Sequence, residues 1–397
     1  MIALTGRILI LVFALSLFAF PAPAPAKMVS YVKEYTYQAS EVDSKLTSRT
    51  VALEQVKRLL LEEVGTYLIS ETEVKDFKLT KDRVYSYAAG IVMTVIIEEK
   101  WDGQTYFLKA KVTSDTDELV KSIDQIRRNK DQEQSMDEMR KKTEEALREI
   151  ERLKEELKKK DSDKTAKDKY VKAVNELTAV DWFRKGHTLR FKAKNNKEAL
   201  EAFSRAIEID PNFAPPYAGR AAIYNDWGQF QKALSESEQA IKIDPNVAWS
   251  YNTMGWAYNG LRRFKKAIEP LNKAIELSPK YAWAYVNRSW AYLALKNYDQ
   301  SLADAEKAIQ YDPKLANGYF RKARVLAALD KTEEAFKNFE KAIELDPSYS
   351  RAFLQRGHLH LKLKNSQQGM EDMKKAASLG NSEAKGYLSG KGIQWQK

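Results

Sequence analysis

The residues that most often carry chemistry are few in this chain. Among its 397 residues there is no cysteine, and the only histidines are His187, His358 and His360. Without cysteine the chain can form no disulfide, no thiolate metal site and no lipid-modified cysteine. His358 and His360 are two residues apart, which places them on different faces of a helix, so they cannot chelate one ion together. We therefore expect no metal and no cofactor.

Sequence motifs for catalysis are also missing. The patterns G-x-S-x-G, H-E-x-x-H and G-x-x-x-x-G-K-[ST] do not occur. The segment LSGKG (388–392) lacks the preceding strand and the spacing of a phosphate-binding loop. The sequence predicts a protein that is not an enzyme.

Tryptophans are the residues with the greatest potential for binding. The stretch AWAYVNRSWAY (282–292) contains Trp283 and Trp290, seven residues apart, and Tyr285 and Tyr292 with the same spacing. Seven residues make about two helical turns, so each pair forms one stripe along a helix. A helix needs one stripe to face a core, and the second stripe is then available to a ligand.

The aromatic residues recur with a period of 34. Prolines at this spacing close similar phrases, such as AIEIDPNFA and AIELDPSYS: Pro211, Pro245, Pro279, Pro313 and Pro347. In frames that begin at 214, 248, 282, 316 and 350, aromatic residues predominate at position 4. Small residues recur at positions 20 and 27, where Ala308 lies, and they let two helices approach closely. A 34-residue period predicts a stacked array of helix pairs.

These repeats resemble the tetratricopeptide repeat family over about 181–390. With an earlier copy from Asp181 to Pro211 there are six repeats, and 382–390 suits a capping helix. The resemblance implies a right-handed superhelix with a concave groove, lined by positions 2, 5, 9 and 12 of the first helix of each pair. Family members are mostly binding scaffolds. In this frame Tyr258 and Tyr292 belong to the packing face.

The resemblance predicts a groove with an aromatic patch, amides that hold an extended peptide, and two bordering arginines. The candidate residues are Trp249, Asn252, Trp256, Trp283, Asn287, Trp290, Asn317, Arg321 and Arg324. Such a surface suits a peptide with apolar side chains and an acidic end, since indoles are enriched at interface hot spots. The alternative is that the indoles pack against the neighbouring helix. Only Asn287 and Arg321 match the five-residue clamp of chaperone-binding relatives, so we reject that subtype.

The N-terminal 26 residues predict a signal peptide. Arg7 precedes the apolar run 8–20, and Ala24-Pro25-Ala26 fits the small-x-small rule for cleavage. We expect the mature chain to begin at Lys27 and to work in the periplasm of a Gram-negative bacterium. The alternative is an inner-membrane anchor formed by residues 8–20.

Residues 27–116 predict a small α+β domain. A strand is expected over 29–39, a helix over 40–68, and a hairpin over 90–115 with its turn at Asp102-Gly103. The pattern resembles the N-terminal modules of bacterial envelope proteins involved in flagellar assembly. That resemblance depends on the helix, the bridge TEVKDFKLTKDRV (72–84), Gly90 and the strand pair.

Residues 117–165 predict a charged helix or a short coiled coil. An apolar seam with heptad spacing runs through Met136, Met139, Thr143, Ala146, Ile150, Leu153 and Leu157. It predicts a parallel homodimer through 136–157 in which Glu149 of one chain pairs with Lys154 of the other. The alternative is a single helix that spaces two domains and is supported by its own i,i+4 ion pairs. A hinge is expected at 158–169.

The expected fold class is mostly α: a tetratricopeptide α-solenoid over 166–397, preceded by a small α+β domain and a charged helical linker. Lys+Arg number 66 and Asp+Glu 55, and the two signs are interspersed, so we expect no nucleic-acid partner. The predicted function is a cell-envelope scaffold that binds a protein or peptide. The alternatives are a carbohydrate-binding or enzyme-accessory subunit, and a pilus or flagellum assembly factor.

Overall fold

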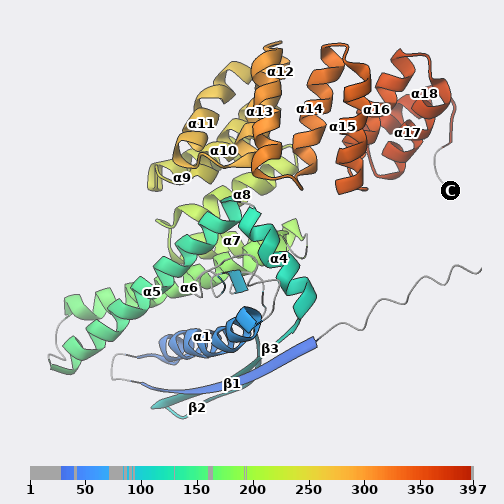
Figure 1. The fold of residues 1–397 in the computed structure, drawn as a ribbon. Coiled ribbons are helices and arrows are strands. Elements are labelled where there is room, and N and C mark those ends of the chain that lie inside the picture. The colour runs from blue at the N-terminus through green and yellow to red at the C-terminus, as the bar shows by residue number, and fades with distance from the viewer. Residues whose placement is uncertain are drawn as a thin grey trace, which may run out of the picture.

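The computed structural model describes residues 28–39, 43–70, 94–128, 130–159, 164–191 and 195–394, with single positions 84, 87, 88, 92 and 193. A small sheet with one helix leads into a long series of helical hairpins (Figure 1). Among these residues no helix has both the length and the apolar character needed to cross a membrane. The predicted signal peptide and most of the bridge 72–84, with Gly90, lie outside the described residues.

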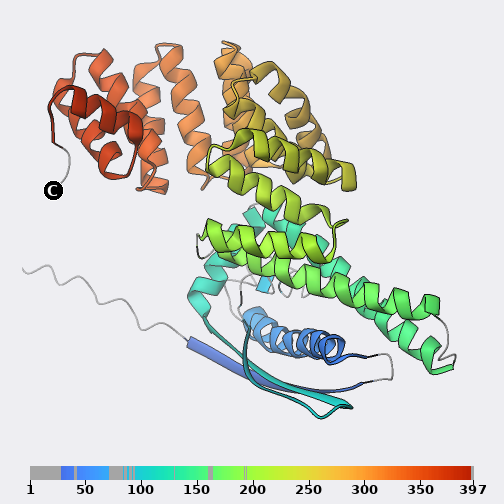
Figure 2. The ribbon, with the colours of Figure 1, turned by 180° about the vertical axis from the view of Figure 1, so that it is seen from behind.

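The N-terminal domain is a three-stranded antiparallel sheet in the order β1-β3-β2. It consists of β1 (Met28–Gln38), β2 (Thr94–Trp101) and β3 (Thr105–Asp115), and α1 (Lys45–Ser70) covers one face (Figure 2). Alternate residues of β3 are buried beneath α1 because successive side chains of a strand point to opposite faces. The predicted strand, helix and hairpin are confirmed, and the turn residue Gly103 has φ +100°.

The charged segment forms α4 (Thr116–Arg128) and α5 (Lys130–Lys159), and α5 packs as an antiparallel hairpin on α6 (Lys164–Phe191). This corrects the predicted parallel dimer, because the seam is covered by the chain itself. Its buried members are Met139, Ala146, Ile150, Leu153 and Leu157. Lys154 donates to the hydroxyl of Tyr37 at 2.6 Å, and Glu149 pairs with Arg152 in its own helix.

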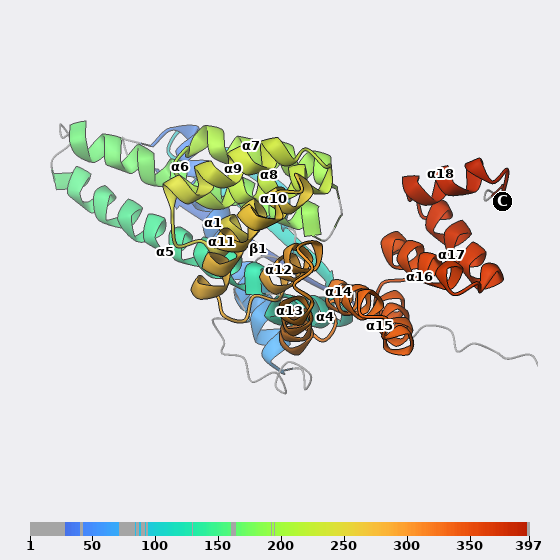
Figure 3. The same ribbon diagram turned by 90° about the horizontal axis from the view of Figure 1, so that it is seen from above.

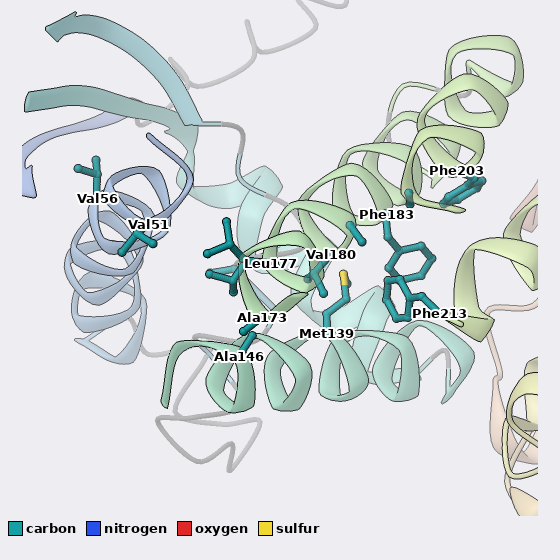
Figure 4. Packing of buried hydrophobic residues seen from close by; sticks show 14 of the residues in the cluster. Val51, Val56, Met139, Ala146, Ala173, Leu177, Val180, Phe183, Phe203 and Phe213 are labelled. Atoms are coloured by element: carbon teal, nitrogen blue, oxygen red, sulfur yellow. The ribbon is translucent and has the colours of Figure 1, made fainter. Parts of the chain in front are cut away.

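A single apolar core joins the N-terminal domain to the array. Val51 and Val56 of α1, Leu177 and Val180 of α6, and Phe203 of α7 (Asn196–Ile209) belong to one cluster (Figure 4). The alternative prediction, a single helix that spaces two domains, does not hold either, because α5 and α6 bury apolar side chains toward each other within this core.

The array continues from the C-terminal part of α6 as stacked helix pairs, which turn progressively when viewed from above (Figure 3). The helices are α7, α8 (Ala214–Asp226), α9 (Phe230–Ile243), α10 (Ala248–Gly260), α11 (Phe264–Leu277), α12 (Ala282–Ala294), α13 (Tyr298–Tyr311), α14 (Ala316–Ala328), α15 (Thr332–Leu345), α16 (Ser350–Lys362), α17 (Ser366–Ser378) and α18 (Ser382–Gly390). As predicted, α18 covers the last apolar surface, with Ala384 and Leu388 buried against α16 and α17.

Two local features repeat with the sequence period. In repeats two to six, the turn between the two helices contains a left-handed residue, with φ from 57° to 71°, at Gly228, Arg262, Lys296, Asp330 and Lys364. The position-4 tyrosines 217, 285 and 319 donate to the carbonyl oxygens of Pro211, Pro279 and Pro313 at 3.1–3.2 Å. These hydrogen bonds tie the first helices α8, α12 and α14 to the loops that precede them, which explains why tyrosine and proline recur together in these three repeats.

Replacing Ala308 with leucine is expected to destabilise the array by about 1–3 kcal/mol, since added methylenes overpack a close helix contact. Ala308 is fully buried beside Tyr285, Val286 and Leu315. The matched control is Ala303→Leu, at an exposed position of the same helix. Urea denaturation followed by circular dichroism measures both. Equal midpoints for the two variants would mean that the repeat frame is wrong.

Candidate functional site

The first helices of successive pairs, α8, α10, α12, α14 and α16, lie side by side in the array. Position 9 of four successive repeats is occupied by Trp256, Trp290, Arg324 and His358, and each of these side chains is partly exposed. Because equivalent positions of stacked repeats fall on one face, these residues form a row that begins with two indoles and continues with two basic groups. We call the face that carries this row the ligand face.

The four predicted tryptophans have two different environments. Trp249 is 7% exposed and belongs to the main core, so the alternative reading, in which an indole packs against a neighbouring helix, holds there. Trp256, Trp283 and Trp290 remain partly exposed, although Trp283 also contacts the clusters around Tyr281 and Tyr285. That these three bind a ligand stays a prediction.

Two of the three predicted asparagines are used inside the array. Asn252 Nδ2 donates to the hydroxyl of Tyr281 at 2.7 Å, and Asn287 Nδ2 donates to Asn252 Oδ1 at 2.9 Å. Both side chains are buried. This corrects the expectation that they hold a peptide backbone, because their amides connect α10 to α12 and its preceding loop. Asn317 is partly exposed, and its Oδ1 accepts a hydrogen bond from the Tyr349 hydroxyl at 2.5 Å.

The predicted arginines lie beside the indole row. Arg321 is 5% exposed, and its guanidinium carbon lies 4.7 Å from the centre of the Trp290 ring. Burial, opposed by Tyr349 and reinforced by Arg324, holds the pKa of Arg321 well below its usual range, although a guanidinium stays charged at neutral pH. Burial likewise lowers the pKa of Arg324. The structure therefore brings Trp290 and Arg321 into contact, and Arg324 acts on Arg321 electrostatically.

Another set of arginines on the same helices has a structural role that the sequence reasoning missed. At position 7, Arg220, Arg288 and Arg356 each form a two-pronged ion pair with an acid 16 residues later: Glu236, Asp304 and Asp372, at 2.6–3.0 Å. Their shared spacing in alternate repeats was a signal that could have revealed them. These pairs hold the two helices of one repeat together.

Models of the tetratricopeptide repeat match residues 182–213, 214–247, 250–281, 282–315, 316–349 and 350–379. The array consists of tetratricopeptide repeats. The first match begins inside α6, so this 28-residue helix serves both as half of the hairpin with α5 and as the first helix of repeat one. Tetratricopeptide repeats form scaffolds suited to protein–protein interaction.

Solved tetratricopeptide structures resemble this chain in fold. A thermophilic repeat protein of Thermus thermophilus is 20% identical over 46% of this chain and 99% of its own, with a TM-score of 0.41. The pilF protein of Pseudomonas aeruginosa is 17% identical over 54% of this chain and 98% of its own, with a TM-score of 0.42. MamA from Desulfovibrio magneticus is 19% identical over 43% and 96%, with a TM-score of 0.35.

The histidines do not gather into a site. His187 is buried near Phe183 and Phe191, His360 stacks on Phe336 with ring centres 4.3 Å apart, and His358 Nε2 lies 3.4 Å from a Glu383 oxygen. Across the described part of the chain, no three potential metal ligands lie close enough to hold an ion.

His187 should make repeat one sensitive to acid. Burial, with Arg190 nearby, lowers the pKa of His187 from 6.5 to about 3. The unfolded chain therefore binds a proton below pH 6.5 that the folded chain does not, and stability falls as the pH falls. Between pH 7.5 and pH 5 the loss should be about 2 kcal/mol. Denaturation of the wild type and of His187→Gln at both pH values isolates this effect; equal pH dependence in the two proteins would contradict it.

Proposed function

We propose that this protein is a non-enzymatic scaffold that binds a protein or peptide segment along the ligand face of its repeats. The observation that carries the proposal is the row of partly exposed side chains in which Trp256 and Trp290 precede Arg324. Large exposed apolar groups are unfavourable unless a partner covers them, and tryptophan and arginine are the residues most enriched at binding hot spots.

The spacing of the row suggests the size of the bound segment. Adjacent packed helices lie about 10 Å apart, so the distance from Trp256 on α10 to Arg324 on α14 is about 20 Å. An extended chain advances about 3.3 Å per residue, so about six residues span the row. The indoles favour apolar side chains at one end, and the arginines favour an acidic group at the other.

A peptide array of random decapeptides, probed with the purified chain, tests this function. We expect selected peptides to quench the fluorescence of the wild type and to lose affinity for a Trp256→Ala variant. The carbohydrate-binding alternative predicts instead that cell-wall glycan captures the chain and that peptides do not. Binding to neither probe would contradict the proposed function, and capture of pilus or flagellum subunits would favour an assembly role.

We further propose that the protein is exported to the periplasm and that its N-terminal domain docks to a second envelope component. The apolar run 8–20 and the motif Ala24-Pro25-Ala26 support export.

Export should remove residues 1–26, because the cleavage motif ends at Ala26. Intact-mass measurement of protein from the periplasmic fraction should give a chain that begins at Lys27. A full-length species in the membrane pellet would favour the anchored alternative.

A further inference from the structure

The sheet of the N-terminal domain has one protected edge and one unprotected edge. Because β3 is central, β1 and β2 each have an edge that pairs with no strand among the described residues. The edge of β2 is protected by a register shift between Ile96 and Glu98 and by three successive charged residues, 98–100. β1 instead pairs with β3 in one unbroken register from Met28 to Gln38 and contains no glycine or proline. A long, regular edge of this kind is a template for another strand.

The hydrogen bonds around β1 show which backbone groups face its unpaired edge. Ala39 N donates to Gln104 O at 2.8 Å, so by alternation the odd-numbered residues of β1 bond to β3. The even-numbered residues therefore direct their N–H and C=O groups to the other side. In agreement with this parity, Lys154 Nζ donates to Gln38 O at 3.2 Å. Lys154 thus occupies the end of the edge, and residues 28–36 are left for another strand.

The side chains along this edge suit strand pairing. Met28 and Val32 are 57% and 47% exposed, on the face of the sheet that α1 does not cover (Figure 2). Between 28 and 36 only Lys33 and Glu34 are charged, and the remaining residues are mostly tyrosine, valine and threonine, which favour strands. Pairing at this edge would remove part of the exposed Val32 side chain from water.

A second copy of β1 fits the edge in antiparallel orientation, and charge selects the register. Residues opposite each other in such a pair have the same parity, so the two-fold axis passes through one residue of each copy. An axis at Lys33 would place two ammonium groups opposite each other and would require Gln38, where Lys154 lies. An axis at Glu34 would place two carboxylates opposite each other. Like charges directly opposite are destabilising, so both registers are disfavoured.

An axis at Val32 avoids these conflicts and pairs the whole available segment, 28–36. Tyr31 then lies opposite Lys33 of the second copy, which suits a cation–π contact, and Ser30 lies opposite Glu34, which can accept its hydroxyl proton. Both copies of α1 lie on one face of the joined sheet. Since strands are about 4.8 Å apart and α1 covers β1 and β3, the two helices would be about 10 Å apart, the spacing of packed helices.

We propose that the protein forms a homodimer in which the β1 edges of two copies pair in antiparallel orientation about Val32. Two three-stranded sheets thereby become one continuous sheet. This inference does not depend on the proposed function, and it uses a different surface from the seam at 136–157, which α6 covers. The dimer presents two ligand faces, so a partner with two binding segments is held more tightly than a partner with one.

The lack of cysteine makes crosslinking at a single introduced position a direct test. In a hydrogen-bonded antiparallel pair the opposite Cα atoms lie about 5.5 Å apart, within the range of a disulfide. Oxidation of purified Val32→Cys with copper phenanthroline should give a covalent dimer. Val95→Cys, at a similarly exposed position on the edge strand β2, should stay monomeric. A mixture of Ser30→Cys and Glu34→Cys should crosslink, and neither variant should crosslink alone.

Replacing Val32 with proline tests the hydrogen bonds of the edge. Proline lacks the N–H that Val32 directs away from β3, and edge strands tolerate it there, so the fold should be retained. Sedimentation of the wild type should show a dimer that increases with concentration. Val32→Pro should weaken dimerisation about thirtyfold, because the two-fold symmetry removes two hydrogen bonds at once. The control is Val32→Thr, which keeps the N–H and the branched side chain, and circular dichroism checks the fold of both variants.

A wild-type chain that stays monomeric, or Val95→Cys that crosslinks as well as Val32→Cys, would overturn the dimer. Equal dimerisation of Val32→Pro and Val32→Thr would place the contact on another surface and would overturn it too. Should Val32→Pro fail to fold, the cysteine variants alone decide. A mixture of Val32→Cys and Glu34→Cys that crosslinks in place of Ser30→Cys and Glu34→Cys would overturn the register. A photoreactive residue at position 32 that captures a different protein in the cell, and no second copy, would also contradict the homodimer.

Discussion

Replacing Arg184 with methionine is expected to lower the free energy of unfolding by about 3–5 kcal/mol, because it breaks a buried ion network and leaves a carboxylate without its cation. Arg184 lies on α6 and contacts Asp181 at 2.8 Å and Glu54 of α1 at 3.4 Å. Lys57 of α1 contacts the same two carboxylates. The four largely buried groups connect the N-terminal domain to the first repeat.

The network contains two carboxylates, Glu54 and Asp181, and two cations, Lys57 and Arg184, and the cations affect the pKa values of both acids. Burial and the neighbouring Glu54 raise the pKa of Asp181 to about 6, whereas Lys57 and Arg184 overcome burial and hold the pKa of Glu54 below its usual range. Without Arg184, two carboxylates share one lysine.

Urea denaturation should show the lower free energy of unfolding of Arg184→Met, and limited proteolysis should cut this variant earlier between α1 and α6. Arg205→Met, which removes a mostly exposed arginine from α7, is the control. Matching midpoints for the two variants would rule out a structural role for the network.

Replacing Trp290 or Tyr285 with alanine should separate binding from folding on one helix. Tyr285→Ala should destabilise the array by about 3–5 kcal/mol, the usual cost of truncating a buried aromatic residue. Its ring is buried, lies 5.5 Å from that of Tyr311, and its hydroxyl donates to the Pro279 carbonyl. Trp290 is partly exposed and contacts Arg321, so Trp290→Ala should change stability far less and weaken ligand binding by about 2 kcal/mol or more.

The sequence pattern suggested Tyr292 as the folding control. Tyr285 is the better control. Tyr292 is only partly buried, and its described ring contact is with Arg288 at 5.9 Å. Circular dichroism melts measure the stability of both variants. Titration with peptides selected on the decapeptide array measures their binding. An unfolded Trp290→Ala together with a stable Tyr285→Ala would show that the two stripes are assigned to the wrong faces.

The repeats were predictable because their determinants are local. The 34-residue spacing of Pro211 to Pro347 fixes the helix pairs, and small residues such as Ala308 mark the close contacts between them. The Asp102-Gly103 hairpin was predictable for the same reason, since the turn type depends on two adjacent residues. The hairpin signal lies in two adjacent residues, and the repeat signal lies in one short pattern that recurs every 34 residues.

The errors arose where distant segments meet. The heptad pattern of α5 shows that one face is apolar but not what covers it. In the structure α6 of the same chain covers this face. Asn252 falls at groove position 5 of its repeat and Asn287 at the adjacent position 6, yet both amides are used within the fold: Asn252 donates to Tyr281, and Asn287 donates to Asn252. Arg321 contacts Trp290 of the preceding repeat, and Tyr349, the last residue of its own repeat, acts on it electrostatically. No pattern within one repeat reveals that arrangement.

Photocrosslinking in living cells tests whether a protein partner binds along the ligand face. A photoreactive amino acid is placed at position 256, on the ligand face, and at position 303, on the exposed side of α13. We expect that position 256 crosslinks one protein, that position 303 does not, and that Arg324→Gln weakens the crosslink. Equal crosslinking from both positions, or a partner that crosslinks only from position 303, would contradict binding along the ligand face.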